Sequence, residues 1–126
     1  EVVFGRRAFM ASSLASLDGS PSDETRVPIM DSRELLQSFP PPYDVIKVDI
    51  EGAEIEFLEH YGEVIAGARA LLIEWHSWNS ARVEGEGITK LLGEIGFPRR
   101  RTMQPAMQVT HEGRAAWCGV ELFLRG

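Results

Sequence analysis

The chain has two kinds of apolar pattern, one typical of buried strands and the other typical of amphipathic helices. Residues 43–50 and 70–76 are rich in apolar side chains, which is typical of strands buried on both faces of a parallel sheet. The second pattern is the spacing i, i+3, i+4, i+7, which is found at Ile88, Leu91, Leu92 and Ile95. This spacing indicates an amphipathic helix. Gly96 is expected to end this helix.

Start and stop signals delimit the elements before the first of these strands. Residues 11–25 are rich in Ser, Gly, Asp and Pro and are predicted to form a loop, followed by a short strand over residues 26–29. Asp31 and Glu34 have the spacing of a capping box, which predicts that a helix begins beside them. The prolines at 40–42 end it, because proline cannot continue the helical hydrogen bonds.

The order of the predicted elements indicates the fold class. Glu51-Gly52 is expected to turn the strand 43–50 into a helix that begins near Ala53. Further strands are predicted at residues 97–103, 107–110 and 117–124, with a turn at 111–114 between the last two. Alternating strands and helices followed by consecutive strands predict an α/β fold, with parallel strands and an antiparallel carboxyl-terminal hairpin. A chain of 126 residues fits one domain.

Composition and charge narrow the classes of partner. The formal net charge of −6 argues against a nucleic-acid partner, and the run at residues 99–101 is interpreted as a solvated basic strand end. No stretch approaches the roughly 20 apolar residues of a membrane span. The single cysteine, Cys118, excludes an internal disulfide and suits a reducing compartment, so we expect a cytoplasmic protein without a membrane partner.

Ionisable residues gather where the two strongest strands end. Asp49 and Glu51 lie two residues apart after the first strand, and Glu54 follows in the first turn of the next helix. Glu74 and His76 end the second strand with the same spacing. Because open α/β sheets bind ligands beyond the carboxyl ends of their strands, we expect these groups to converge on one site.

Three interpretations of this cluster remain open. His76 can act as a general base on a hydroxyl group while a carboxylate orients it, or the cluster can hold a divalent cation. The third interpretation is structural: Glu51 and Glu54 cap the helix, and His76 satisfies a backbone group. Trp75 and Trp78 flank His76 and are candidates for lining a substrate pocket, although large aromatic residues more often close a core.

The segment 44–58 carries the sequence D-x-E-G-A-E at residues 49–54, and it closely resembles the signature of FkbM-type methyltransferases. Residues 71–76 resemble the fifth strand of that family with its E-x-H ending. Residues 27–36 are similar to the short strand and helix that the family places before the signature. Residues 88–97 resemble its later helix and Gly-aromatic turn. Outside residues 26–97 the resemblance is weak.

This resemblance implies the carboxyl-terminal part of a Rossmann-like class I methyltransferase that moves a methyl group from S-adenosylmethionine to a hydroxyl oxygen of a sugar or natural product. It places Asp49 against both the methyl donor and the acceptor. Glu51 and His76 are then catalytic, with His76 as the base. Glu54 and Glu74, together with Trp75 and Trp78, are assigned to substrate binding. No metal ion is part of this assignment.

The amino-terminal residues depart from the family pattern. Residues 1–25 contain no G-x-G sequence, so the glycine loop that holds the cofactor is missing from them. Without the strand that precedes this loop, the strand 43–50 is expected to form a bare sheet edge. Such an edge invites pairing with another chain, so we expect a homodimer and little affinity of this chain alone for the cofactor.

Two other functions stay open beside the O-methyltransferase. The first is a non-catalytic fragment, or a self-associating interaction module, that keeps a methyltransferase-like fold. The second is a metal-dependent hydrolase that uses Asp49, Glu51, Glu74 and His76, because this ligand set suits hard or intermediate cations.

Overall fold

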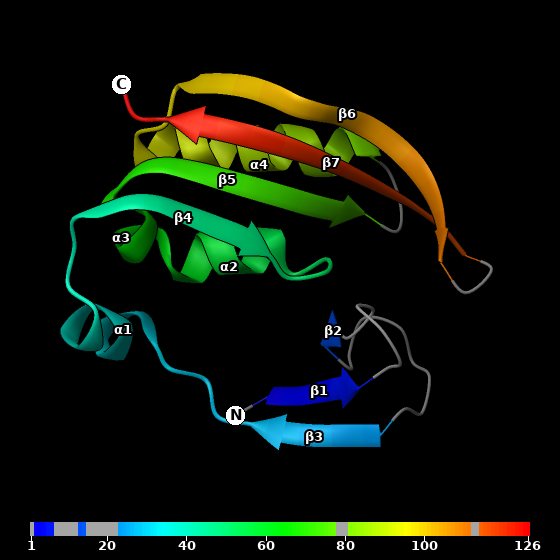
Figure 1. The fold of residues 1–126 in the computed structure, drawn as a ribbon, viewed down its shortest axis with the longest axis horizontal. Helices are drawn as coiled ribbons and strands as arrows, with labels where there is room; N and C mark the ends of the chain where they lie inside the picture. The colour runs from blue at the N-terminus through cyan, green and yellow to red at the C-terminus, as the bar shows by residue number, and fades with distance from the viewer. Residues whose placement is uncertain (1, 7–12, 15–22, 78–80, 112–113) are drawn as a thin grey trace.

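The computed structural model describes residues 2–6, 13–14, 23–77, 81–111 and 114–126. The first described elements are the strands β1 (Val2–Arg6), β2 (Ser13–Leu14) and β3 (Asp23–Val27). They form a small antiparallel sheet in the order β2-β1-β3 (Figure 1). The prediction of a loop over residues 11–25 is therefore wrong at 13–14 and 23–25, which pair with β1. The short strand predicted at 26–29 ends at Val27.

Helix α1 (Ser32–Ser38) begins where the capping box predicts. The Asp31 side chain accepts a hydrogen bond from the Glu34 backbone at 2.8 Å, and the Glu34 side chain accepts one from the Asp31 backbone at 3.0 Å. These reciprocal bonds satisfy two amide groups that a helix start otherwise leaves without a partner. The helix ends before Pro40, as predicted.

The main sheet has four strands, which are β4 (Tyr43–Asp49), β5 (Ala68–Ser77), β6 (Arg99–His111) and β7 (Arg114–Leu124). Their order is β4-β5-β7-β6, with β4 parallel to β5 and the β6–β7 hairpin antiparallel (Figure 1). The chain is thus an α/β protein with a mixed sheet. Strands predicted separately at 97–103 and 107–110 are one strand, whose register against β7 shifts between Thr102 and Met107.

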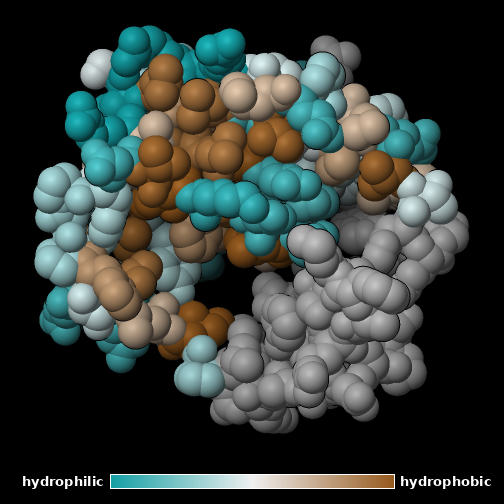
Figure 2. Space-filling view, in the orientation of Figure 1, coloured by the Kyte–Doolittle hydropathy of each residue, from teal (hydrophilic) through white to brown (hydrophobic). Residues whose placement is uncertain are grey.

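Helices cover one face of this sheet (Figure 1). They are α2 (Glu54–His60), α3 (Gly62–Ile65) and α4 (Ala81–Ile95). Burial along β5 alternates accordingly: Leu71, Ile73 and Trp75 are buried, while Leu72 and Glu74 are partly exposed. We call the side without these helices the open face. Figure 2 shows apolar side chains gathered on it over the middle of the sheet.

The hydrophobic core lies between the sheet and its helices. Leu58, Ile65 and Leu92 from the helices are at most 1% exposed, and they meet Leu71 and Phe123 from the strands. Burial of such side chains stabilises the fold by about 1.5–3 kcal/mol each. Gly96 ends α4 as predicted, with a φ of 114° that glycine adopts without a steric penalty.

Strand β4 lies at an edge of the sheet. Its apolar composition alone favours a central strand, but Val45 on the open face is 58% exposed. None of the described helices combines the length and the apolar character needed to cross a lipid bilayer.

Candidate functional site

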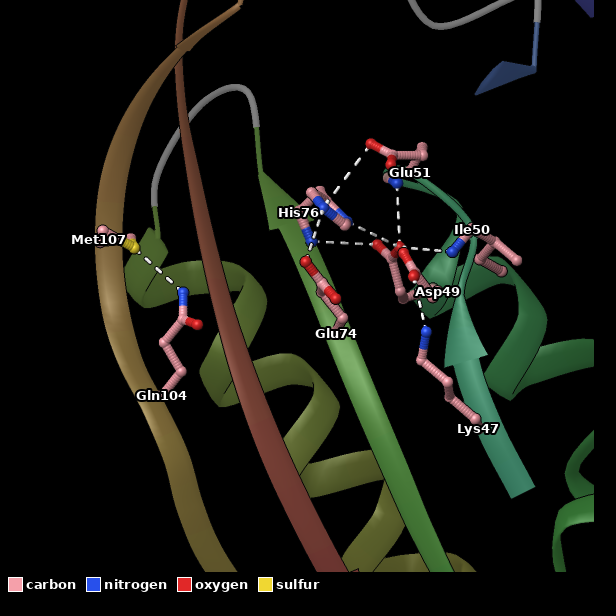
Figure 3. A network of polar contacts seen from close by, with 10 residues as sticks. Lys47, Asp49, Ile50, Glu51, Glu74, His76, Gln104 and Met107 are labelled. Atoms are coloured by element: carbon pink, nitrogen blue, oxygen red, sulfur yellow. Dashed lines mark hydrogen bonds and ion pairs between the residues drawn. The ribbon is translucent and has the colours of Figure 1, made fainter. Parts of the chain in front are cut away.

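The parallel pairing of β4 with β5 brings the predicted ionisable residues together. Asp49 and Glu74 are directly paired at the ends of their strands. Because side chains alternate along a strand, Glu74 and His76 lie on the same face as Asp49, which is the open face. Figure 3 shows these three side chains converging with Glu51. The convergence predicted from the sequence is therefore present.

His76 stands at the centre of the cluster. Its side chain is only 12% exposed, with Nε2 3.6 Å from Glu51 Oε2 and 3.8 Å from Glu74 Oε1. The other ring nitrogen, Nδ1, lies 3.3 Å from Glu54 Oε1. In the neutral ring, this carboxylate favours the proton on Nδ1 and leaves Nε2 as the acceptor toward the open face.

Glu54 lies beneath the site and is 1% exposed. Its carboxylate accepts hydrogen bonds from the backbone of Gly52 at 3.0 Å, His76 at 3.3 Å and Ile50 at 3.4 Å. It thereby ties the turn after β4 to the end of β5, because one side chain satisfies amides from both segments. Its contact with a substrate stays a prediction; its observed contacts fix the backbone and His76.

The turn after β4 requires an unusual backbone. Glu51 has a φ of 56° and Gly52 a φ of 101°. Glycine adopts such angles freely, whereas a residue with a Cβ atom pays a steric penalty there. The Glu51 side chain is carried toward His76 by this conformation. The Glu51-Gly52 turn itself is confirmed.

The surroundings of His76 and Glu51 shift their proton affinities. Burial lowers the pKa of His76, but the hydrogen bond and charge of Glu54, with the charges of Glu51 and Glu74, outweigh burial and raise it. Burial raises the pKa of Glu51, and the nearby carboxylates add to this effect while His76 opposes it. Both groups therefore hold a proton more readily than they do in an unfolded chain.

The raised pKa of His76 predicts how stability depends on pH. Its protonated form is favoured in the folded state, so its contribution is fully present below the unfolded pKa of about 6.5. The contribution is lost as pH rises through the higher folded pKa. We expect the difference in free energy of unfolding between the wild type and His76→Gln to shrink across this range. Urea denaturation in buffers containing EDTA measures it; a difference that is constant or grows with pH would contradict the assignment.

Asp49 projects from the end of β4 and forms an ion pair with Lys47, with 2.9 Å between Nζ and Oδ2. The hydrogen bond from Lys47 to Asp49 and the negative charge of Asp49 raise the pKa of Lys47. Since the Lys47 side chain is 60% exposed, the pair is worth little to stability. Asp49 keeps a second carboxylate oxygen for a ligand.

Asp49, Glu74 and His76 also offer the geometry of a cation site. One ligand atom from each lies within 4.8 Å of the other two. Two carboxylate oxygens and an imidazole nitrogen suit a divalent transition metal. Among the residues that the structure describes, this set is where such ligands converge.

Trp75, one of the two tryptophans proposed for a substrate pocket, does not lie on the site's face of the sheet. Trp75 is 2% exposed and packs on the helix-covered side, where it borders a cavity of about 460 Å³ with Arg100 and Glu121. It faces away from His76, since adjacent strand residues point to opposite faces. A substrate contact for Trp75 stays a prediction, and Trp78 lies outside the described residues.

An ion pair between the partly exposed Arg100 and the buried Glu121 on this second face was not predicted. Arg100 donates to both carboxylate oxygens of Glu121, at 3.0 and 2.8 Å, and Glu121 is 3% exposed. The basic run at 99–101 is therefore more than a solvated strand end. The hairpin accounts for this ion pair, because Arg100 pairs with Phe123 and Thr102 pairs with Glu121. Arg100 and Glu121 are therefore diagonal neighbours on one face of the sheet.

Comparison with protein-family models, with curated proteins and with solved structures finds no match for this chain.

Proposed function

We propose that the chain carries the acceptor side of an S-adenosylmethionine-dependent O-methyltransferase of the Rossmann-like class I type. The observation that carries the proposal is the convergence of Asp49, Glu51, Glu74 and His76 at the ends of two parallel strands. These residues come from the D-x-E-G-A-E and E-x-H segments that resemble the FkbM-type signature. The parallel pair followed by an antiparallel hairpin agrees with the fold that this resemblance implies.

The geometry of His76 suits removal of a proton from a hydroxyl group. A hydroxyl bound on the open face beside Nε2 would donate to that nitrogen and pass its proton to it as the oxygen is methylated. Glu54 holds Nδ1 at 3.3 Å and stabilises the resulting imidazolium. Glu51 and Glu74 flank Nε2 and favour the same charged form, so the base is stronger than a free histidine.

The residues present fit one end of the cofactor. S-adenosylmethionine supplies an electrophilic methyl group on a cationic sulfur, and the carboxylates of the site favour a positive charge. The free oxygen of Asp49 at the strand end would face this group. Residues 1–25 carry no glycine loop for the adenosine end. The fit is therefore confined to the donor methyl and the acceptor.

Replacing Asp49 with alanine tests this proposal. With methyl-labelled S-adenosylmethionine at millimolar concentration and a panel of sugar and polyketide alcohols, we expect Asp49→Ala to lose at least about a hundredfold in transfer rate. Its thermal midpoint should stay close to that of the wild type, because the exposed Lys47–Asp49 pair contributes little. Lys47→Met is the matched control and should keep most of the activity.

The outcomes of this assay separate the competing functions. No transfer by the wild type, together with no heat of binding for S-adenosylhomocysteine, would contradict the proposal and favour a non-catalytic interaction module. Hydrolytic activity that EDTA abolishes would favour the metal-dependent alternative, which the spacing of Asp49, Glu74 and His76 supports.

A further inference from the structure

The cavity on the helix-covered side of the sheet lies where β6 bulges away from β7. Between Thr102 and Met107, β6 takes five residue steps, whereas β7 takes three steps between the residues that pair with them. Strand β6 therefore carries two extra residues in this stretch, where Pro105 and Ala106 line the cavity. Bulges of this kind redirect side chains and are frequent beside binding sites.

Two glycines let the indole ring of Trp75 lie beside this bulge. Trp75 pairs with Gly119 of β7, and a Cβ atom at Gly119 would lie 2.8 Å from Cε2 and 3.0 Å from Nε1 of the ring. Because β7 lies between β5 and β6, the edge of the ring that carries Nε1 extends across β7 toward the bulge. Gly85 of α4 lines the cavity from the helix, also without a side chain.

The indole N–H of Trp75 is buried without a hydrogen-bond acceptor in the part of the chain that the structure describes. The residue is 2% exposed, and a buried N–H group without an acceptor is unfavourable. Since the ring lines the cavity, a molecule bound there can supply the acceptor when the ring turns toward it. Trp75 therefore offers a hydrogen-bond donor to a ligand.

Arg100 supplies further donors on the wall of the cavity. Its guanidinium group donates to both carboxylate oxygens of Glu121 and to Thr89 Oγ1. These described contacts use three of its five N–H groups. Glu121 is 3% exposed, and its two-point contact fixes the plane of the guanidinium group. The other two N–H groups are thereby held in place for an acceptor.

We propose that this cavity binds a small, neutral, planar molecule that carries a carbonyl group. Its volume of about 460 Å³ is typical of small-molecule sites. The donors of Trp75 and Arg100 would bind the carbonyl oxygen, while the indole ring, Pro105 and Ala106 offer apolar surface to a flat ring. The described lining holds two carboxylates and one guanidinium group, which disfavours an anion, and the N–H donors disfavour a cation. The site is separate from the cluster at His76, because Trp75 points to the opposite face of the sheet.

Benzamide and benzoate form a matched pair of probes for this site. They share a flat ring and nearly the same size, but benzamide is neutral and benzoate is an anion. In nuclear magnetic resonance spectra of the isotope-labelled 126-residue chain, the indole N–H signal of Trp75 is identified by its loss in Trp75→Phe. We expect benzamide to shift this signal to higher frequency, as a new hydrogen bond does, with saturation and a dissociation constant on the order of 1 mM. Benzoate is expected to bind at least about fivefold more weakly.

Two phenylalanine substitutions locate the bound probe. Ala106→Phe places a ring in the cavity and should weaken benzamide binding at least about tenfold, because the ring takes the space of the probe. Ala115→Phe is the matched control and should leave binding as in the wild type, because Ala115 is exposed on the same hairpin and lies outside the described lining. If the backbone spectrum shows that Ala106→Phe does not fold, Thr102→Phe takes its place, since Thr102 is an exposed residue of the lining.

The possible results decide the proposal. A Trp75 signal that does not move with benzamide, or that moves without saturating, would overturn it. Equal binding by the wild type and the folded cavity variant would also overturn it, because the probe would then lie elsewhere. Benzoate that binds as tightly as benzamide would contradict the assignment to neutral ligands. Saturable binding of benzamide that Ala106→Phe weakens and Ala115→Phe preserves would support the site.

Discussion

Replacing Glu54 with alanine is expected to lower the free energy of unfolding by about 3 kcal/mol, because buried backbone donors lose their acceptor. The carboxylate accepts from Gly52 and Ile50 in the turn and from His76 at the end of β5. At 1% exposure the space it leaves gives water little access. Urea denaturation at pH 7 measures the change.

Glu56 supplies the control for this prediction. It is exposed and lies in the same turn of α2, so Glu56→Ala removes a helix carboxylate without removing a buried acceptor. We expect its effect to stay within about 0.5 kcal/mol. Equal losses for the two variants would show that the helix, rather than the hydrogen bonds of Glu54, determines the effect.

Replacing Gly119 with alanine is expected to destabilise the fold by about 1–3 kcal/mol, because the added methyl group overpacks the core. A Cβ atom there would lie 2.7 Å from Cζ2 and 3.0 Å from Nε1 of Trp75. Trp75 is 2% exposed, and a Cβ atom built at Gly85 of α4 would lie 3.7 Å from Cζ2 of the same ring. To make room for the methyl group, the ring must shift within its packed position beside the cavity that it borders, and this costs packing contacts. The loss is measured as a lower midpoint in thermal and urea denaturation.

The same substitution at Gly93 is expected to have the opposite effect on stability. It lies in α4, where an added methyl group would meet no atom within 4 Å, and alanine favours the helix. Gly93→Ala is therefore expected to stabilise the chain by about 0.5–1 kcal/mol. If Gly119→Ala were equally stabilising, the close packing of Trp75 on β7 would be wrong.

The parts of the fold predicted from the sequence are those set by local interactions. The capping box at Asp31 and Glu34 depends on two residues three positions apart, and it is present as expected. The convergence of Asp49 with Glu74 and His76 followed from parallel pairing of two strongly apolar strands. Both inferences needed only residue spacing and a general rule of sheet topology.

The missed features depend on pairings between distant segments. Strand β6 continues through residues 104–106 because β7 supplies its partner across a register shift. The burial of Glu54 was missed because a carboxylate in a first helical turn usually faces solvent, whereas here β5 covers it. The orientation of Trp75 was available from strand parity: a residue between Glu74 and His76 must point to the other face.

The backbone conformation of Glu51 lowers the stability of the fold but keeps the Glu51 carboxylate in the site. A glycine at this position would adopt its φ of 56° without the penalty of roughly 1 kcal/mol that a side chain incurs. A chain selected only to fold well would therefore favour Gly-Gly at this turn. The sequence instead keeps a carboxylate 3.6 Å from His76, so its position is better explained by what the side chain does there than by the needs of the turn.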